Sequence, residues 1–292
     1  MKAKKYCFDG TKKLKLNELS TNSKDDKVTK EDIIAKTQEN QEKISALQER
    51  FYADGREGVI LVLQAIDAAG KDSTVKHVMS GINPQGVVVT SFKQPNTEEL
   101  AHDFLWRVNK HLPQRGMIGI FNRSYYEDVL VVQVHKINHN YHMAKRVVEM
   151  DDDKFFKKRY NHIRNYEEYL YDNSYRVVKV FLNVSKDEQK ARFLERIDNP
   201  EKNWKFDAGD LKERALWDEY HEVFEDVINE TATKECPWYV LPADQKWYTR
   251  YLVSEILLKT LEDINPQYPQ MSEEETSQLQ ECRDILMKET EN

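Results

Sequence analysis

The sequence is poor in cysteine, in long apolar runs and in net positive charge. Its three cysteines lie far apart and show no metal-ligand spacing. An odd, sparse count argues against a disulfide framework and indicates a reducing compartment. No apolar run approaches the roughly 20 residues that span a bilayer, and no apolar stretch follows the basic first five residues as in a secretory signal. We therefore expect a cytoplasmic protein with no membrane partner.

The formal net charge is −7, with 44 Lys and Arg against 51 Asp and Glu. Nucleic-acid-binding domains usually carry a basic surface, so we expect no nucleic-acid partner. An anionic small-molecule substrate stays open, because the field inside one cleft decides its binding. The 15 Tyr, 11 Phe and 5 Trp supply core material that a disordered chain lacks. A length of 292 residues suits one large α/β domain, alone or with a mobile insertion.

Apolar segments of strand length recur along the chain and alternate with helical stretches. The expected strands are 58–64, 87–90, 117–121, 177–182 and 238–241, and the expected helices are 31–52, 73–80, 97–112, 152–172 and 186–198. This alternation predicts right-handed βαβ crossovers and a central parallel sheet with helices on both faces, a three-layer αβα fold.

The two ends of the chain differ from this pattern. Residues 1–30 hold nine Lys, four acids and few large apolar residues, which predicts an irregular N-terminal arm, packed on a neighbouring subunit. Residues 271–292 are acidic and polar, and form either a tail or a last helix built on Leu279, Ile285 and Leu286. The domain between them is expected to span 31–270, with a lid at about 152–215.

The segment that follows the 58–64 strand has the features of a phosphate-binding loop. It reads Ala65-Ile66-Asp67-Ala68-Ala69-Gly70-Lys71-Asp72-Ser73. A strand that enters a glycine-containing turn and then a helix aims backbone N–H groups and the positive helix end at one point. Lys71 adds a mobile charge, as in a Walker A loop, although that motif has Gly at the position of Ala65 and Ser or Thr at that of Asp72.

Two acids in this loop point to a cation. Carboxylates beside a phosphate repel it unless a metal ion lies between them, so Asp67 is expected to be linked to Mg²⁺, directly or through water. Asp72 has two readings of equal weight: a second metal-linked carboxylate, or a helix cap.

A second strand end is expected at the same edge of the sheet. The 117–121 strand leads into Asn122-Arg123-Ser124-Tyr125-Tyr126-Glu127-Asp128, and ligands of open α/β sheets bind beyond the carboxyl ends of strands. Arg123 suits bidentate contact with phosphate oxygens, with a surface salt bridge as the alternative. Glu127 and Asp128 either begin a helix or face the nucleotide or metal.

Together these segments resemble the polyphosphate kinase 2 family. The resemblance rests on the 67–72 and 121–128 motifs and on a third block, Arg192-Phe193-Leu194-Glu195-Arg196 followed by 199–206, which is similar to the family's lid. It covers roughly residues 30–265. It implies a P-loop kinase-like fold with a helical lid, and phosphoryl transfer between inorganic polyphosphate and nucleotides with Mg²⁺, or Mn²⁺ as an alternative.

By position, the resemblance assigns roles to single residues. It implies that Asp67, Lys71 and Arg123 are catalytic and that Asp67 is associated with the metal. Contacts to nucleotide or phosphate are expected from Ala68, Ala69, Gly70, Asp72, Ser73, Asn122, Glu127, Arg192, Arg196, Lys202 and Lys205. The implied partners are polyphosphate and AMP, ADP and ATP, with guanine nucleotides as further candidates, in a homo-oligomer of two or four chains.

The wording of the second motif points to a subgroup. Asn122, Tyr126 and Glu127 resemble the family members that accept both nucleoside mono- and diphosphates, whereas those preferring diphosphates read closer to Asp-Arg-Ser-Trp-Tyr-Asn. We therefore expect reversible conversion of AMP to ADP and ATP. The rivals are an ATP-dependent nucleoside monophosphate kinase of similar fold and a non-catalytic nucleotide or polyphosphate sensor.

Polyphosphate carries about one charge per unit and needs a basic channel. Two sets of residues are candidates for lining it: Lys154, Lys157, Lys158, Arg159 and Arg164, and then Lys190, Arg192, Arg196, Lys202 and Lys205. A solvated helix face is the alternative for each set. Trp204 and Phe206 are expected to pack within the lid rather than stack on a base.

Overall fold

The computed structural model describes residues 1–289 and is built around a six-stranded sheet. The strand order is β1-β6-β5-β2-β4-β3. The strands are β1 (Cys7–Phe8), β2 (Gly58–Gln64), β3 (Val87–Ser91), β4 (Ile118–Asn122), β5 (Tyr175–Asn183) and β6 (Trp238–Pro242). All neighbours from β6 to β3 pair in parallel, and β1 pairs antiparallel with β6. The expected α/β fold is confirmed, with one added antiparallel edge strand.

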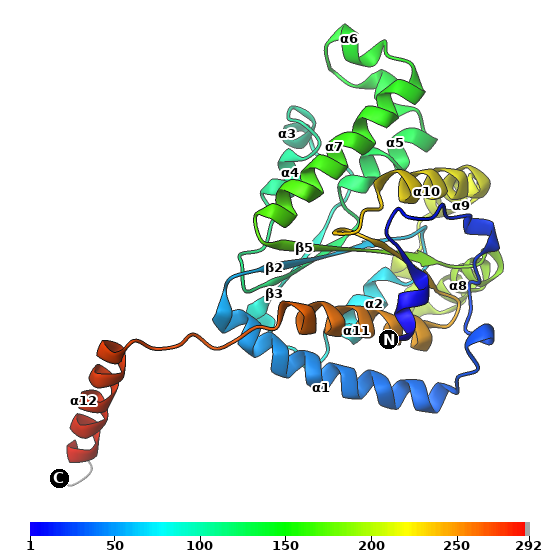
Figure 1. The fold of residues 1–292 in the computed structure, drawn as a ribbon. Helices are drawn as coiled ribbons and strands as arrows, with labels where there is room; N and C mark the ends of the chain where they lie inside the picture. Colours follow the sequence, from blue (N-terminus) through cyan, green and yellow to red (C-terminus); the bar gives the residue numbers. More distant parts are fainter. Residues whose placement is uncertain (290–292) are drawn as a thin grey trace.

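Helices cover both faces of this sheet, as Figure 1 shows, with α1 and α11 on one face and α7 and α10 on the other. The α-helices are α1 (Lys30–Asp54), α2 (Lys71–Val78), α3 (Thr97–Leu100), α4 (Trp106–Asn109), α5 (Val131–Val134), α6 (Lys145–Val148), α7 (Asp152–Asp172), α8 (Lys186–Asp198), α9 (Gly209–Ala215), α10 (Trp217–Thr231), α11 (Lys246–Ile264) and α12 (Glu273–Glu289). The short 3₁₀ helices are η1 (Lys2–Tyr6), η2 (Leu16–Glu18), η3 (Lys24–Asp26), η4 (Pro84–Gly86), η5 (Tyr125–Asp128), η6 (Ile137–Asn140) and η7 (Pro200–Lys205).

The register of the central strands brings their carboxyl ends together. Every residue of β2 is buried, as expected for a strand with neighbours on both edges and helices on both faces. Leu63 of β2 pairs with Asn122 of β4, and Gln64 pairs with Phe181 of β5. The loops that follow β2, β4 and β5 therefore leave the sheet at one edge, where ligands of open α/β sheets bind.

The single helix expected over residues 97–112 is wrong. The structure has two short helices there, α3 and α4. Between them, the Asp103 carboxylate accepts a hydrogen bond of 3.0 Å from the backbone N–H of Leu105. Such a local side-chain bond offers the backbone an alternative to the helical ladder, so the apolar spacing alone overestimated the helix.

The N-terminal arm packs on the outer helices of its own chain, and its packing on a neighbouring subunit stays a prediction. Leu14 and Leu16 are buried. Their backbone N–H groups donate to Asn229 and Glu225 of α10, each at 2.7 Å. The N–H of Ala3 donates to Glu255 of α11 at 2.9 Å. The arm thus ties the outer helices α10 and α11 to the sheet edge.

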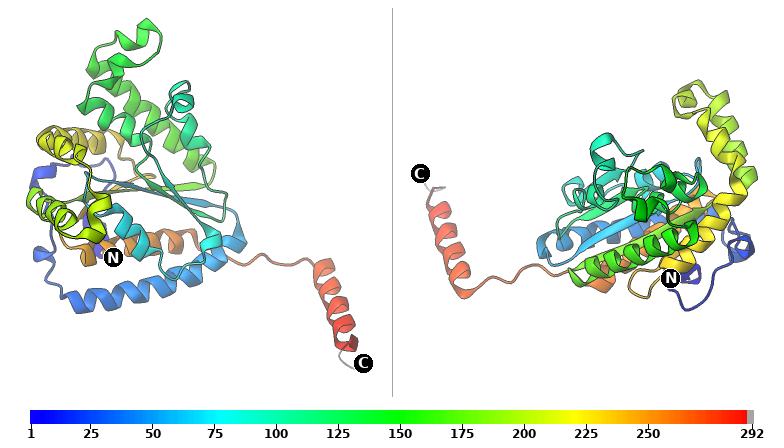
Figure 2. Two further views of the ribbon diagram at one scale, coloured as in Figure 1. Left: turned by 180° about the vertical axis from the view of Figure 1, so that it is seen from behind. Right: turned by 90° about the horizontal axis from the view of Figure 1, so that it is seen from above.

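The C-terminal segment stands apart from the body. Figure 2 shows α12 at the end of an extended connection in both views, and its residues are exposed. Of the two alternatives for 271–292, the helix is what the structure has over Glu273–Glu289, and 290–292 lie outside the described residues. Within residues 1–289, no helix is long and apolar enough to cross a membrane.

The 152–215 range expected for the lid includes parts of the body. It contains α7, which packs on β5, and β5 itself, a central strand. In the remainder, α8 and η7 contribute residues to the cavity at the carboxyl edge of the sheet, and α9 follows η7. The boundaries of a moving lid stay a prediction.

Candidate active site

The loop between β2 and α2 adopts a conformation that few residues favour. Gly70 precedes α2 with a φ of 106°, which glycine adopts without steric cost. Ala68 has a φ of 60°, and its Cβ makes this left-handed conformation unfavourable by about 1 kcal/mol. A strained turn of this kind persists only where its surroundings hold it.

Arg192 of α8 holds this loop from behind. Its guanidinium donates to the carbonyl oxygens of Ala68 and Ala69 at 3.1 and 2.6 Å, and to those of Ala243 and Asp244 at 2.6 and 3.0 Å. The side chain is only 5% exposed. Arg192 borders the cavity, as expected for a phosphate contact, but its donors are engaged with the backbone, so its geometry is that of a clamp on the loop.

A second residue of α8, which the sequence did not indicate, has the same function. The Nε2 of Gln189 donates to the carbonyl of Asp67 at 2.9 Å. Arg214 of α9 in turn donates to Gln189 Oε1 at 2.7 Å. The α8 and α9 helices therefore orient three successive carbonyl groups of the loop away from the cavity, together with Arg192.

Lys71 reaches back over the loop that precedes it. Its Nζ donates to the carbonyl oxygens of Ala65 and Ile66 at 2.8 and 3.4 Å. Burial, together with the nearby charge of Arg123, lowers the pKa of Lys71 to about 8. Two carbonyl oxygens satisfy the ammonium group less well than phosphate oxygens would, so this lysine is suited to follow an anion.

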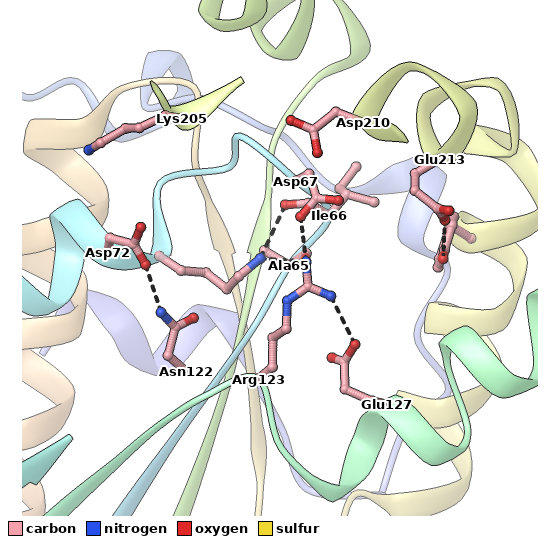
Figure 3. A network of polar contacts seen from close by, with 12 residues as sticks. Ala65, Ile66, Asp67, Asp72, Asn122, Arg123, Glu127, Lys205, Asp210 and Glu213 are labelled. Atoms are coloured by element: carbon pink, nitrogen blue, oxygen red, sulfur yellow. Dashed lines mark hydrogen bonds and ion pairs between the residues drawn. The ribbon is translucent and has the colours of Figure 1, made fainter. Parts of the chain in front are cut away.

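Arg123 joins the ends of β2 and β4. Its Nη2 donates to Asp67 Oδ1 at 2.6 Å, and its Nη1 donates to Glu127 Oε2 at 3.1 Å (Figure 3). Its own backbone has a φ of 64°, and its N–H donates to the Leu63 carbonyl at 3.0 Å. The strained backbone and the two ion pairs aim the guanidinium at the loop, as its expected role requires.

Asp72 has a partner at the end of β4. The amide Nδ2 of Asn122 donates to Asp72 Oδ1 at 2.6 Å. No side chain caps α2, so the helix-cap reading of Asp72 is wrong. Ser73 points back into the loop, where its Oγ donates to the Gly70 carbonyl at 3.2 Å. Both residues border the cavity.

The segment from η7 to α9 contributes charges above the loop. Arg196 donates to Asp210 Oδ2 and to the Lys205 carbonyl, both at 3.3 Å. Lys202 pairs with Glu195 at 2.5 Å. Asp210 lies beside Asp67 in Figure 3, and burial together with that neighbour raises the pKa of Asp210. Two adjacent carboxylates with this mutual repulsion favour a cation nearby.

The aromatic residues of this segment behave differently from each other. Phe206 packs edge-on against Phe193, with ring centroids 6.3 Å apart, so its expected packing role is confirmed. Trp204 is 78% exposed, so the same expectation is wrong for Trp204. No signal in the sequence separates these two aromatic residues, because each follows a polar residue, Trp204 within η7 and Phe206 directly after it.

Most of these residues line one cavity of about 1040 Å³. All of the predicted catalytic and binding residues border it, from Asp67 to Lys205. Its floor carries Asp67, Lys71 and Arg123. One end, beyond β5 and β6, is mainly cationic and carries Arg192, Arg196, Lys202, Lys205 and Lys246, with Glu195 as an acid among them. The other end, beyond β3 and β4, is lined by the apolar or aromatic residues Phe92, Pro95, Leu100, Val131, Val132, Ile137 and Tyr141, together with Lys93, Gln94, Arg107, Asp128 and Asn140.

Several of these residues were missed from the sequence. Lys246 is the first residue of α11, directly beyond the carboxyl end of β6, a position that the sheet topology could have indicated. The sequence allows two positions for Asp128, at the start of a helix or facing the nucleotide or metal. It is buried, its Oδ1 accepts a 3.1 Å bond from the Tyr141 hydroxyl, and burial raises its pKa to about 6. Tyr141 and Arg107 carry no local signal, because tertiary packing alone brings them to the cavity.

The first basic set expected to line a polyphosphate channel lies elsewhere. Lys154, Lys157 and Lys158 of α7 border a separate shallow depression with Asn161 and His162. Arg159 stacks over Phe104, with its guanidinium carbon 4.1 Å from the centre of the ring. Of the second set, every member except Lys190 borders the main cavity.

Comparison with known proteins relates the chain to one family. The family model described as Polyphosphate kinase 2 (PPK2) matches residues 27–269. The chain is 48% identical over 249 residues to an ADP-polyphosphate phosphotransferase of Rhodopseudomonas palustris, covering 85% of each chain. It is 50% identical over 228 residues to an AMP/ADP-polyphosphate phosphotransferase of Meiothermus ruber, covering 78% of this chain and 80% of the relative.

A solved structure has the same architecture. The crystal structure of Polyphosphate Kinase 2 from Arthrobacter aurescens TC1 superposes with a TM-score of 0.82 at 37% identity, covering 92% of this chain and 93% of that chain.

Proposed function

The chain belongs to the polyphosphate kinase 2 family, and from this premise we propose that it transfers phosphoryl groups from inorganic polyphosphate to AMP and ADP. The observation that carries the proposal is the division of the cavity. Its cationic end suits a chain of phosphates, its apolar end suits a nucleoside, and Asp67, Lys71 and Arg123 lie between the two. A conventional kinase using ATP as donor needs a second nucleoside site in place of the cationic end.

The cationic end of the cavity supports polyphosphate as the phosphoryl donor. Lys202, Lys205 and Lys246 each bring an ammonium group to one side of the cavity, and Arg196 adds a guanidinium. Each phosphate unit of polyphosphate carries about one charge, so successive cations along a groove match its spacing better than one strong site would. Arg192 contributes its charge from behind the loop without giving up its carbonyl contacts.

The residues at the loop fit a divalent cation. Among the described residues, no group of three acidic, His or Cys side chains forms a ready-made metal site. Mg²⁺ usually takes one or two carboxylates and obtains its other ligands from water and substrate phosphates. Asp67, with Asp210 beside it, supplies that donor set, and Mn²⁺ accepts the same oxygens. When bound, the ion would neutralise the charge that develops on the transferring group.

The chain's own residues perform the positioning. Lys71 releases the Ala65 carbonyl and contacts the transferring phosphoryl group, while Arg123, fixed by Asp67 and Glu127, contacts its oxygens from the β4 side. Little covalent chemistry is needed, because phosphoryl transfer depends on in-line alignment and charge stabilisation. The accepting oxygen of AMP or ADP is already ionised, so no general base is required. Closure of the α8–α9 segment excludes water, which otherwise competes as acceptor.

The acceptor range includes both AMP and ADP. The two relatives of 48% and 50% identity carry names with different acceptors, so overall similarity alone does not decide. Asn122 places a neutral amide, bonded to Asp72, where an acid would repel the phosphate of the acceptor. Guanine nucleotides, a homo-oligomer of two or four chains and a cytoplasmic location remain further parts of the proposal.

A direct test is incubation of the purified protein with polyphosphate, Mg²⁺ and either AMP or ADP, followed by chromatography of the nucleotides. The proposal expects ADP and then ATP from AMP, and ATP from ADP. A parallel reaction with ATP as donor to AMP should be much slower. Absence of product from both acceptors with polyphosphate overturns the proposal, and faster transfer from ATP supports the conventional kinase.

A further inference from the structure

A fully buried ion pair lies behind η5, the turn that follows β4. Lys179 of β5 contacts Glu167 of α7, with Nζ 2.6 Å from Oε2, and the two side chains are 0% and 1% exposed. The same ammonium donates to the Thr231 carbonyl at 2.8 Å. A buried pair of this kind contributes little net stability compared with well-packed apolar residues, because desolvation offsets the attraction. Its presence in the core therefore calls for another reason than stability.

The second oxygen of Glu167 shows what the pair holds. Glu167 Oε1 accepts hydrogen bonds from the hydroxyls of Tyr125 and Tyr126, both at 2.8 Å. These are the first two residues of η5, and both are buried. Burial and the charge of Glu167 raise the pKa of both phenols, so both remain donors. One carboxylate, held by Lys179, thus fixes two adjacent side chains of a single turn.

That turn carries the residues that face the cavity. Arg123 lies two residues before Tyr125, and Glu127 follows Tyr126 directly. Arg123 reaches Asp67 from a strained backbone with a φ of 64°. A strained residue keeps its conformation only when its neighbours are fixed. Any shift of the two tyrosines is therefore transmitted along the chain to the guanidinium of Arg123.

We propose that Glu167 and Lys179 are positioning residues that set the place of Arg123 through Tyr125 and Tyr126, although neither borders the cavity. The inference rests on the proposed function and adds a layer of residues behind the site. A displacement of about 1 Å at a reacting group can lower the rate by about 100-fold. Disruption of the network should therefore lower kcat. The KM for polyphosphate depends on the cationic end of the cavity and should be largely unaffected.

The test removes the two hydroxyls without changing the shape of the core. The Tyr125→Phe/Tyr126→Phe double variant should fold, lower kcat by about 100-fold and leave the KM for polyphosphate within about threefold. Tyr248→Phe is the matched control, because the buried Tyr248 hydroxyl donates to the Asp26 carboxylate at 2.6 Å, away from the cavity. The control should lose comparable stability and keep its kcat. A double variant with wild-type kcat overturns the proposal.

A crystal structure tests the positioning role independently of the proposed function. In a crystal structure of the double variant, the contact between Arg123 and Asp67 should be lost or lengthened, whatever reaction the wild-type protein performs. Retention of that contact at its present distance overturns the positioning role. Inactivity of the wild-type protein with polyphosphate overturns the proposed function and leaves the structural reading as the deciding result for Glu167 and Lys179.

Discussion

The guanidinium of Arg123 lies 2.6 Å from the carboxylate of Asp67, which links the turn after β4 to the loop after β2. The two residues are 56 positions apart in sequence, yet the pairing of Leu63 with Asn122 places them at one edge of the sheet. This contact orients the arginine and holds the acid that is expected to accompany the metal ion.

Replacement of Asp67 by Asn should affect both functions of the carboxylate. The amide oxygen still accepts a weaker bond from Arg123, but the charge for the metal ion is lost. We expect kcat to fall by about 100-fold or more and the Mg²⁺ concentration for half-maximal rate to rise. Titration of the rate with Mg²⁺ measures both. Asp187→Asn, at an exposed position in the first turn of α8, is the control, and equal Mg²⁺ dependence in the two variants contradicts the metal role.

Replacement of Lys71 by Met should abolish turnover without unfolding the protein. The methionine keeps most of the apolar volume, and the charge that follows the phosphoryl group disappears, so we expect a loss of about 1,000-fold or more in kcat. Circular dichroism and thermal unfolding check the fold. Lys76→Met, at an exposed position of the same helix, should retain the wild-type rate. A Lys71→Met enzyme within tenfold of wild type would show that the site is misassigned.

The pH dependence of the reaction should report Lys71. Its pKa in the anion-free protein is lowered to about 8, so the lysine is charged below that pH and neutral above it. We expect kcat/KM, which reports the free enzyme, to fall as pH rises through 8. Bound phosphate favours the charged form, so kcat at saturating polyphosphate should persist to higher pH. The Lys71→Arg variant should lack this limb, because guanidinium does not titrate there.

A level profile of kcat/KM up to pH 10 in the wild-type enzyme would contradict this assignment. It would mean that the ammonium of Lys71 keeps its proton in the free enzyme, or that its charge is not needed for capture of the donor.

The two ends of the cavity should determine the KM values of different substrates. The Lys205→Ala/Lys246→Ala variant removes two cations from one end, and we expect the KM for polyphosphate to rise by about tenfold or more, with weaker dependence on salt. The KM for AMP should change by less than about threefold. Tyr141→Phe at the other end should alter the KM for AMP and leave that for polyphosphate unchanged. Lys190→Ala, exposed on α8 outside the cavity, is the control for charge alone.

Initial rates with one substrate varied at a time provide these constants. Equal changes in both constants for the Lys205→Ala/Lys246→Ala variant would contradict the division of the cavity between donor and acceptor.

Much of the sheet could be predicted from local pattern. The apolar run of β2 and the span of α8 needed only periodicity and caps, and the expected bounds 58–64 and 186–198 agree with the structure. The broken helix around Asp103 could not be predicted from spacing, because one side-chain hydrogen bond outweighs a weak helical preference. The contacts of the arm with its own chain could not be predicted either, because Leu14 and Leu16 bond to residues of α10 that lie more than 200 positions later.

The residues that make up the site were predicted better than the contact that each of them makes. Asp67, Lys71 and Arg123 meet where motif order and strand register imply. Arg192 was expected to face a polyanion, but its hydrogen bonds to Ala68 and Ala69 make it a clamp. A sequence gives the charge of such a residue and not the direction of its donors. Lys246 follows from the sheet topology, whereas Tyr141 reaches the cavity through tertiary packing, for which a single sequence carries no local signal.

Phosphoryl transfer from polyphosphate to AMP can be followed directly with ³²P-polyphosphate and unlabelled AMP in a single turnover with Mg²⁺. The account predicts labelled ADP, with label in its terminal phosphate, at a rate that the Arg123→Ala variant loses. Release of the label only as inorganic phosphate, or formation of ADP only when ATP replaces polyphosphate, would contradict it.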